Sequence, residues 1–406
     1  MKIAICFKAI QQRDGTCQFA MQLGEVLAHA GHQVTMMASI IRSTEITENT
    51  PQLTYVSLQQ FRMESKVAHV RRIGSILSEQ SFQVIFICLG LPVPNLEYAL
   101  RLVPDSTAIV PILGGDREHV YQFMKNTLDL WNLAVAESPR LEQQVNLQMP
   151  QKPTQLLITG ISQPLVSELS ARIAASTPLR IFYVGRLVGR GRKNVLLLPK
   201  ILASCVARGL QVTLSICGKG IDQQKLAQAI DEEGVSHLVE FKEIPLRVDL
   251  YEAYRNHHIL LWTSDYGEGL GLVLMEAQAN GCVPVASRLI GVTDFTIGDE
   301  SSGLLAEIGD IKEFTDQIER LADPITWQQF STAAIARTQM KFSFAEMERE
   351  YEALLNKLVN GQFPLPRSRS LIPAARFMLK DYMPSQFRSI IHRFVQFFFR
   401  LKAKLL

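Results

Sequence analysis

Residues 262–287 read WTSDYGEGLGLVLMEAQANGCVPVAS, and this stretch gives the strongest indication of the fold. The apolar run His258–Thr263 predicts a buried strand of a parallel sheet. The glycines that follow predict a loop whose backbone approaches a ligand closely. A helix is expected from Gly271 to Asn280, because Gly281 provides a C-terminal stop, and Val283–Ala286 begins the next strand. This order predicts an anion site, since unpaired N–H groups and the helix dipole face the ligand.

Two glutamates in this stretch, Glu268 and Glu276, lie eight positions apart. Glu268 is in the glycine loop, whereas Glu276 is inside the apolar run of the helix. A carboxylate in such a run is costly to bury unless hydrogen-bond donors surround it. Sugar or ribose hydroxyls would supply them, so the pattern indicates a nucleotide sugar with its diphosphate on the amides. The structural alternative is a Glu276 paired with a core arginine and a solvated Glu268.

This segment resembles the EX7E motif of retaining glycosyltransferases with a GT-B fold, and its flanking residues resemble family 4 of that class. The resemblance covers roughly residues 1–358. It implies that Glu268 lies by the donor sugar, that Glu276 binds the ribose hydroxyls, and that the intervening backbone holds the diphosphate. That backbone comprises Gly269, Leu270, Gly271, Leu272 and Val273. Leu270 stands where many members of the family carry Phe.

The same resemblance implies two cations on the diphosphate. Arg186 lies in the sequence VGRL, and Lys193 follows shortly after it. Positive charge at the leaving group stabilises the transition state as the glycosidic bond breaks, without a metal. Arg190 and Arg192 compete for this role, and the structural alternative is an arginine in a surface ion pair.

Three further residues are assigned by the resemblance alone. Gly218, in Cys-Gly-Lys-Gly, is expected beside the nucleotide. Gly15 is expected in an N-terminal loop that reaches the sugar or the acceptor. His119 is the candidate histidine near the reacting centre, although a lone histidine is more often a surface or a satisfied core residue.

Composition limits the remaining possibilities. A chain of 406 residues is too long for one ordinary core, so two domains are expected. The six cysteines show no metal-ligand spacing, which favours reduced thiols. There is also no Asp-x-Asp, so we expect neither a metal nor another cofactor. The N-terminus predicts a first strand rather than a signal peptide, and no apolar stretch reaches membrane-spanning length.

Apolar runs bounded by turn residues predict strands at 2–7, 34–38, 84–89, 132–137 and 156–159 in the first half, and at 181–184 and 212–217 in the second. The alternation of strands and helices, together with the resemblance, predicts an α/β GT-B fold with two Rossmann-like domains that face an interdomain cleft. Pro164–Pro178 is the expected linker. A capping box at Ser343 and Glu346 predicts the start of a late helix. The expected parts are an acceptor-side domain (1–165), a donor domain (178–342), a crossing helix (343–360) and a basic aromatic tail (363–406).

From Gly361 onward the chain carries nine basic residues and one acid, a net charge of +8, so the body carries −5 of the total of +3. Aromatic and basic residues interleave in the tail at helical spacing. This pattern predicts an amphipathic helix that binds an anionic membrane surface. The alternatives are a helix packed on the body or on a partner subunit, and a nucleic-acid contact, which the acidic body disfavours.

Together these features predict a retaining, metal-independent glycosyltransferase. Its substrates would be a UDP- or GDP-linked hexose or N-acetylhexosamine and a glycan or lipid-linked acceptor. We expect it in the cytoplasm, peripherally bound at the inner face of the plasma membrane, in cell-surface polysaccharide synthesis. The alternatives are a nucleotide-sugar epimerase of the same fold and a non-catalytic glycan-binding or scaffold protein.

Overall fold

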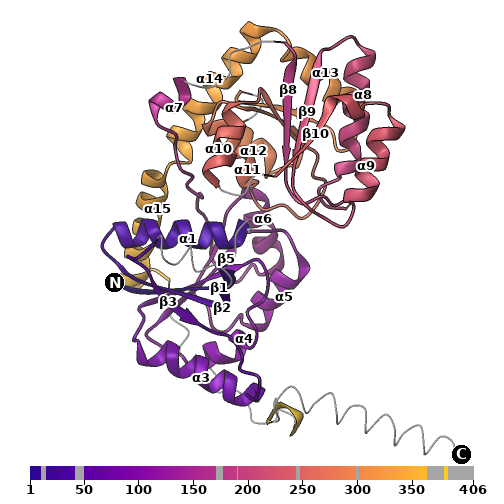
Figure 1. Cartoon of the computed structure of the whole chain (residues 1–406). Helices are drawn as coiled ribbons and strands as arrows, with labels where there is room; N and C mark the ends of the chain where they lie inside the picture. Colours follow the sequence, from indigo (N-terminus) through magenta and orange to yellow (C-terminus); the bar gives the residue numbers. More distant parts are fainter. Residues whose placement is uncertain are drawn as a thin grey trace, which may run out of the picture.

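A computed structural model describes residues 1–10, 15–41, 50–170, 177–189, 191–243, 247–298, 301–363 and 379–382. Within these residues the chain forms two parallel sheets, each flanked by helices (Figure 1). The first sheet has seven strands in the order β3-β2-β1-β4-β5-β6-β7, and the second has six in the order β10-β9-β8-β11-β12-β13. This arrangement confirms two Rossmann-like α/β domains.

The N-terminal domain alternates strands and helices as far as the linker. Its elements are β1 (Lys2–Ile10), α1 (Gly15–His29), β2 (Gln33–Ile41), β3 (Thr54–Ser57), α3 (Lys66–Glu79), β4 (Val84–Leu89), α4 (Leu96–Ala99), η1 (Leu100–Leu102), β5 (Ala108–Leu113), α5 (Glu118–Asn126), β6 (Ala134–Ala136), α6 (Pro139–Gln148) and β7 (Thr154–Leu156).

The C-terminal domain repeats this alternation after the short linker helix α7. Its elements are α7 (Val166–Ser170), β8 (Leu179–Val184), η2 (Val195–Leu197), α8 (Leu198–Ala207), β9 (Val212–Cys217), α9 (Gln223–Glu232), η3 (Ser236–Leu238), β10 (Val239–Lys242), α10 (Arg247–Arg255), β11 (Ile259–Trp262), α11 (Leu272–Ala279), β12 (Val283–Ser287), α12 (Thr293–Ile297), β13 (Leu304–Ala306), α13 (Ile311–Arg320) and α14 (Pro324–Lys341).

Strand alternation divides each domain into two apolar layers. In β1, Ile3, Ile5 and Phe7 enter one core, whereas Ala4 and Cys6 enter the other. Both faces are covered because helices pack on each side of a parallel sheet. All six cysteines lie in the described part of the chain; they are buried and form no disulfide.

The sequence analysis did not predict the central strand β5, between β4 and β6. Its middle residue, Pro111, pairs in register with Ile87 of β4. A proline normally argues against a central strand because it cannot donate to the ladder.

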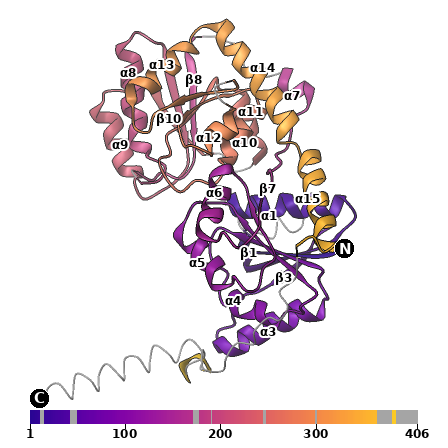
Figure 2. The same ribbon diagram turned by 180° about the vertical axis from the view of Figure 1, so that it is seen from behind.

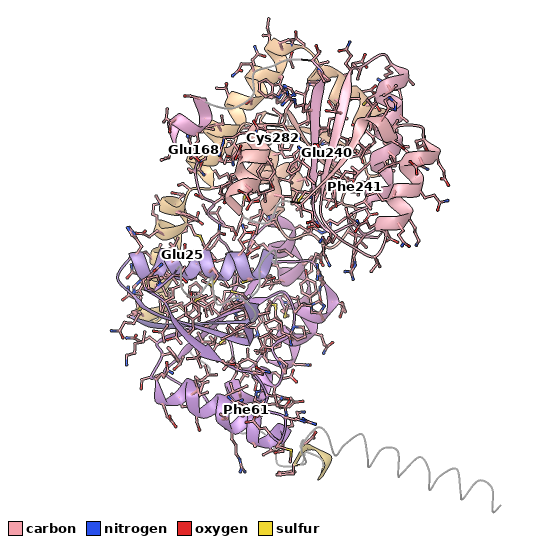
Figure 3. The ribbon with its side chains drawn as sticks, viewed as in Figure 1. Glu25, Phe61, Glu168, Glu240, Phe241 and Cys282 are labelled. Atoms are coloured by element: carbon pink, nitrogen blue, oxygen red, sulfur yellow. The ribbon has the colours of Figure 1, made fainter. Side chains whose placement is uncertain are left out.

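The expected linker, Pro164–Pro178, contains the short helix α7, which the sequence analysis did not predict. Glu168 of α7 lies 3.4 Å from Arg255 of α10 and ties the linker to the C-terminal domain (Figure 3).

Helix α15 (Phe344–Val359) crosses back to the N-terminal domain (Figure 2). Its N-cap is Ser343, whose Oγ accepts a hydrogen bond from the Glu346 amide at 3.2 Å. The Glu346 side chain pairs with Arg349 instead of returning to the cap, so only half of the predicted capping box forms. Its apolar face completes the N-terminal core with Met347, Tyr351, Leu354, Leu355 and Leu358.

Most of the predicted basic tail lies outside the described residues. The short helix η5 (Leu379–Tyr382) is described, and it lies against α3 at the end of the N-terminal domain that is remote from the C-terminal domain (Figures 1 and 2). Among the helices that the structure describes, none combines the length and the apolar character needed to cross a bilayer.

Candidate active site between the two domains

The loop between β11 and α11 presents a row of backbone N–H groups. Gly271, with φ of 84°, caps the helix. Within the described part of the chain, the amides of residues 269–273 have no hydrogen-bond acceptor; the first amide of this helix with a partner is that of Leu274, which bonds Gly271 at 2.9 Å. Leu270 is buried, and Leu272 and Val273 pack against neighbouring apolar clusters. Only the backbone of this segment therefore remains for a ligand, as an anion site requires.

Lys193 and Glu268 form an ion pair beside these amides. The Lys193 Nζ lies 2.8 Å from the Glu268 Oε1, and the two side chains are 17% and 18% exposed. The lysine ammonium also lies 5.5 Å from the centroid of the Trp262 ring. Two hydrogen bonds fix the lysine loop, from the Thr263 Oγ1 to the Lys193 carbonyl at 2.9 Å and from the Asp265 amide to the Arg192 carbonyl at 2.8 Å. The structure thus joins two predicted site residues that lie far apart in the sequence.

Arg186 belongs to the same cluster. Its side chain is exposed, and its carbonyl accepts a hydrogen bond from the Tyr183 hydroxyl at 3.0 Å. Burial raises the pKa of Tyr183, and the nearby Glu268 carboxylate raises it further while Arg186 lowers it. Tyr183 therefore lies close enough to both Glu268 and Arg186 for their charges to change its pKa. Of the two competing arginines, Arg192 is exposed, and Arg190 lies outside the described residues.

Gly218 follows β9 and packs against the loop that carries Arg186. A Cβ at Gly218 would lie 1.8 Å from the Gly185 carbonyl oxygen, so a larger residue would push these two turns apart. The Gly185 amide bonds the Cys217 carbonyl at 3.0 Å. The glycine thus has a packing reason, and its predicted contact with the nucleotide stays a prediction.

Glu276 is almost fully buried on α11, with 3% of its surface exposed. Its Oε1 accepts a hydrogen bond from the Gln18 Nε2 of α1 at 2.7 Å, and its Oε2 accepts one from the Tyr254 hydroxyl at 3.3 Å. Burial and the adjacent carboxylate raise the pKa of Tyr254, which keeps that hydroxyl protonated as a donor. The sequence analysis missed both donors because no local pattern connects them with Glu276. Gln18 comes from the opposite domain, so Glu276 lies at the domain boundary.

Glycines bring the two domains into close contact. A Cβ at Gly269 would lie 2.4 Å from the Gly114 carbonyl oxygen of the N-terminal domain. A Cβ at Gly15, the first residue of α1, would lie 3.9 Å from the Leu272 Cδ1. Gly15 therefore faces the start of α11, and its predicted contact with the sugar or the acceptor stays a prediction.

Substitution of Gly269 by alanine is expected to lower kcat/KM for the glycosyl transfer proposed below by about 10- to 100-fold, because the loop at Gly114 must shift by about 1 Å. The measurement is steady-state kinetics, with circular dichroism to show that each domain keeps its secondary structure. Wild-type kinetics in a folded Gly269→Ala variant would show that this contact has no bearing on the site.

His119 lies on α5, with an exposed side chain whose Nε2 bonds the Gly90 carbonyl at 2.7 Å. Because a carbonyl only accepts, the Nε2 carries the proton. The predicted reactive role of His119 stays a prediction.

The loop before α5 contributes a contact that the sequence analysis missed. The Arg140 Nε donates to Asp116 at 2.7 Å, and the Arg140 amide bonds the Gly291 carbonyl of the C-terminal domain at 3.1 Å.

Part of the sequence is similar to known glycosyltransferases. Residues 167–337 match the family model described as glycosyl transferases group 1. The D-inositol 3-phosphate glycosyltransferase of Mycolicibacterium smegmatis is 33% identical over 138 residues, which cover 33% of this chain and 31% of that relative. The enzyme of the same name from Saccharomonospora viridis is 30% identical over 168 residues, 38% of each chain. This chain thus spans about a third of the length of these curated relatives.

Solved structures match over nearly the whole chain. Sucrose-phosphate synthase from Thermosynechococcus elongatus gives a TM-score of 0.72 at 19% identity, over 89% of this chain and 99% of that chain. HepE of Anabaena, solved in complex with UDP and glucose, gives a TM-score of 0.68 at 16% identity, over 88% and 100%. These likenesses show the GT-B fold.

Among the described residues, no group of three His, Cys, Asp or Glu side chains is arranged to hold a metal ion.

Proposed function

We propose that this protein is a retaining glycosyltransferase of the EX7E type. It transfers a hexose or an N-acetylhexosamine from a UDP- or GDP-linked sugar to a glycan or lipid-linked acceptor, in cell-surface polysaccharide synthesis. One observation carries the proposal: the unit from β11 to α11 contains Glu268, the unpartnered amides of residues 269–273 and the buried carboxylate of Glu276, and Lys193 from the loop after β8 pairs with Glu268. HepE, of the same fold, binds UDP and glucose, which favours a uridine nucleotide.

The proposed roles follow from charge. The bond that breaks joins the anomeric carbon to a phosphate oxygen, so negative charge grows on the leaving diphosphate. The amides of α11, together with Lys193 and Arg186, stabilise that charge. Two cations at the leaving group supply what a divalent metal supplies elsewhere, so we propose a metal-independent reaction without a cofactor. The oxygen of the acceptor hydroxyl forms the new bond to the anomeric carbon, and its proton passes to the leaving diphosphate.

Both carboxylates exchange partners when the donor binds. Lys193 turns from Glu268 to the diphosphate, and Glu268 becomes available to a sugar hydroxyl. Glu276 receives a ribose hydroxyl in place of Gln18, while Tyr254 stays bonded to it. The diphosphate carries more negative charge than the Glu268 carboxylate, so the move of Lys193 from the carboxylate to the diphosphate favours the bound state.

A thermal-shift panel tests the proposal. Purified protein is heated with UDP, GDP, ADP and common nucleotide sugars, each with and without EDTA. We expect a rise in Tm with one nucleotide family that EDTA leaves unchanged. Product analysis with the stabilising nucleotide sugar then separates transfer from epimerisation. No shift with any nucleotide would contradict the donor site.

We further propose that the protein works in the cytoplasm, at the inner face of the plasma membrane, held there by residues 363–406. Helix η5, which belongs to this segment, contacts α3. The exposed Phe61, Arg62 and Met63 shortly precede α3, and the exposed Arg71 lies on it. Figure 3 shows Phe61 at the end of the domain remote from the C-terminal domain. Each cation near an anionic leaflet contributes about 1 kcal/mol, and the tail carries several.

Removal of residues 383–406 is expected to release the protein from vesicles that contain anionic lipid, because it deletes Arg388, Arg393, Arg400, Lys402 and Lys404 while leaving η5 in place. Co-sedimentation measures this release. Neutral phosphatidylcholine vesicles are the control, since the full chain should bind them weakly. A truncated chain that still sediments with anionic vesicles would locate the membrane contact elsewhere.

A further inference from the structure

Glu137 is a buried carboxyl at the domain boundary to which none of the roles above applies. It follows β6 directly and is 5% exposed. Strand alternation places it on the face of the sheet that Val135 occupies, within the core under α1 and α15. Within the described part of the chain, its carboxyl has neither a hydrogen-bond partner nor an ion pair. An unpartnered carboxyl in such a position is costly and calls for an explanation.

Gly114 lies directly beside this carboxyl, and its lack of a side chain leaves space there. A Cβ at Gly114 would have the Glu137 carboxyl as its nearest neighbour, at 3.4 Å from Oε2 and 3.7 Å from Oε1. Gly114 is itself exposed, and its carbonyl oxygen faces Gly269 at the start of the unpartnered amides. Glu137 therefore lies next to Gly114, the residue of the N-terminal domain that contacts the loop with the unpartnered amides.

Among the residues that the structure describes, no cation offsets a charge on this carboxyl. Burial raises the pKa of Glu137 to about 8. Cys88 on β4 and Tyr351 on α15 lie near it: burial raises the pKa of both groups, and a charge on Glu137 raises both further. The charged groups of the surrounding elements have other partners. Asp116 after β5 and Glu268 form ion pairs with Arg140 and Lys193. Glu276 of α11 and Glu350 of α15 accept hydrogen bonds from Gln18 and from the Ile158 amide.

We infer that Glu137 is a ligand-contacting residue of the donor site, where its neutral carboxyl donates a hydrogen bond to an oxygen of the bound nucleotide sugar and its ionised form repels the diphosphate. The inference rests on the proposed function, because it takes the amides of residues 269–273 as the diphosphate site. A neutral carboxyl offers one donor, whereas a carboxylate offers none and adds a like charge beside the anion.

The sign of the pH dependence follows from the protonation state. Glu137 is protonated below about pH 8 and ionises above it. If only the protonated form binds, the affinity for UDP is constant below that pH and falls about tenfold for each further pH unit. The phosphates of UDP are already ionised at pH 7 and contribute little to this change, since a phosphate monoester has its second pKa near 6.

Isothermal titration calorimetry of UDP between pH 6.5 and pH 9.5 tests the inference on the full chain. Wild-type affinity should fall about fivefold between pH 8 and pH 9 and that of Glu137→Gln should not, because the amide keeps a donor and cannot ionise. At pH 8, wild type should take up about half a proton on binding and the variant none. Parallel pH profiles for both would overturn the inference while leaving the donor site intact. No binding of UDP or GDP to wild type at pH 7 would overturn both proposals.

Gly114→Ala is the matched variant, and it keeps the test decisive if Glu137→Gln fails to fold. The backbone of Gly114 is not left-handed, so alanine fits there, and the added methyl covers the carboxyl without touching Gly269. It should weaken UDP binding at pH 7 severalfold and abolish the proton uptake. Unchanged affinity and unchanged proton uptake would show that Glu137 is structural only.

Discussion

Replacement of Lys193 by alanine is expected to lower kcat by about 10²- to 10³-fold, the usual loss when one electrostatic donor is removed from a transition state. The lysine lies beside the unpartnered amides, and its loop is fixed to the loop that carries Glu268. Its removal takes a positive charge from the leaving diphosphate and leaves Glu268 without its partner. The measurement is initial-rate kinetics with the donor that the thermal-shift panel identifies.

A matched control separates this effect from a change in net charge. Lys312 forms a solvent-exposed ion pair with Asp316 at 2.9 Å in the same domain. Lys312→Ala should keep wild-type kinetics, because exposed pairs contribute little. The double variant Lys193→Ala/Glu268→Gln removes the pair as a unit. If it recovers most of the activity, the single variant suffers from the unpaired carboxylate rather than from a lost diphosphate contact.

Replacement of Glu276 by alanine is expected to weaken UDP binding on the order of 100-fold. A hydrogen bond to a charged group contributes about 1.5–3 kcal/mol, and a ribose offers two hydroxyls. The fold should persist, although the variant leaves Tyr254 and Gln18 without their acceptor. Calorimetry measures the affinity, and 2′-deoxy-UDP identifies the contact, because wild type should discriminate against it and the variant should not.

Gln18→Ala tests the alternative role of Glu276, that of holding the domains together. This variant removes the 2.7 Å hydrogen bond from α1 but leaves the carboxylate in place. If ribose replaces Gln18, UDP affinity in Gln18→Ala stays equal to that of wild type or improves. An equal loss in Gln18→Ala and Glu276→Ala, with no discrimination against the deoxy nucleotide, would assign Glu276 to domain contact alone.

Local signals were sufficient for much of the fold. The predicted strands Val84–Leu89 and Val212–Cys217 agree residue for residue with β4 and β9, because each is an apolar run bounded by turn residues. The predicted helix Gly271–Asn280 differs from α11 by one residue at each end. Strand β5 escaped prediction because a buried Pro111 contradicts the usual preference, and the packing of β4 and β6 on either side outweighs that preference.

For the candidate site too, some features follow from local sequence signals and others only from long-range packing. The spacing of Glu268 and Glu276 and the glycines around them are local, so the sequence by itself determined the loop, the helix and the predicted anion site. Long-range packing alone decided which groups these carboxylates meet: Lys193 for Glu268, and Gln18 and Tyr254 for Glu276. Only the tertiary structure brought Glu137 to the boundary next to Gly114, where it has no partner among the described residues. The physical reason is that a hydrogen bond between residues 258 positions apart depends on how two domains pack, and no local period encodes that.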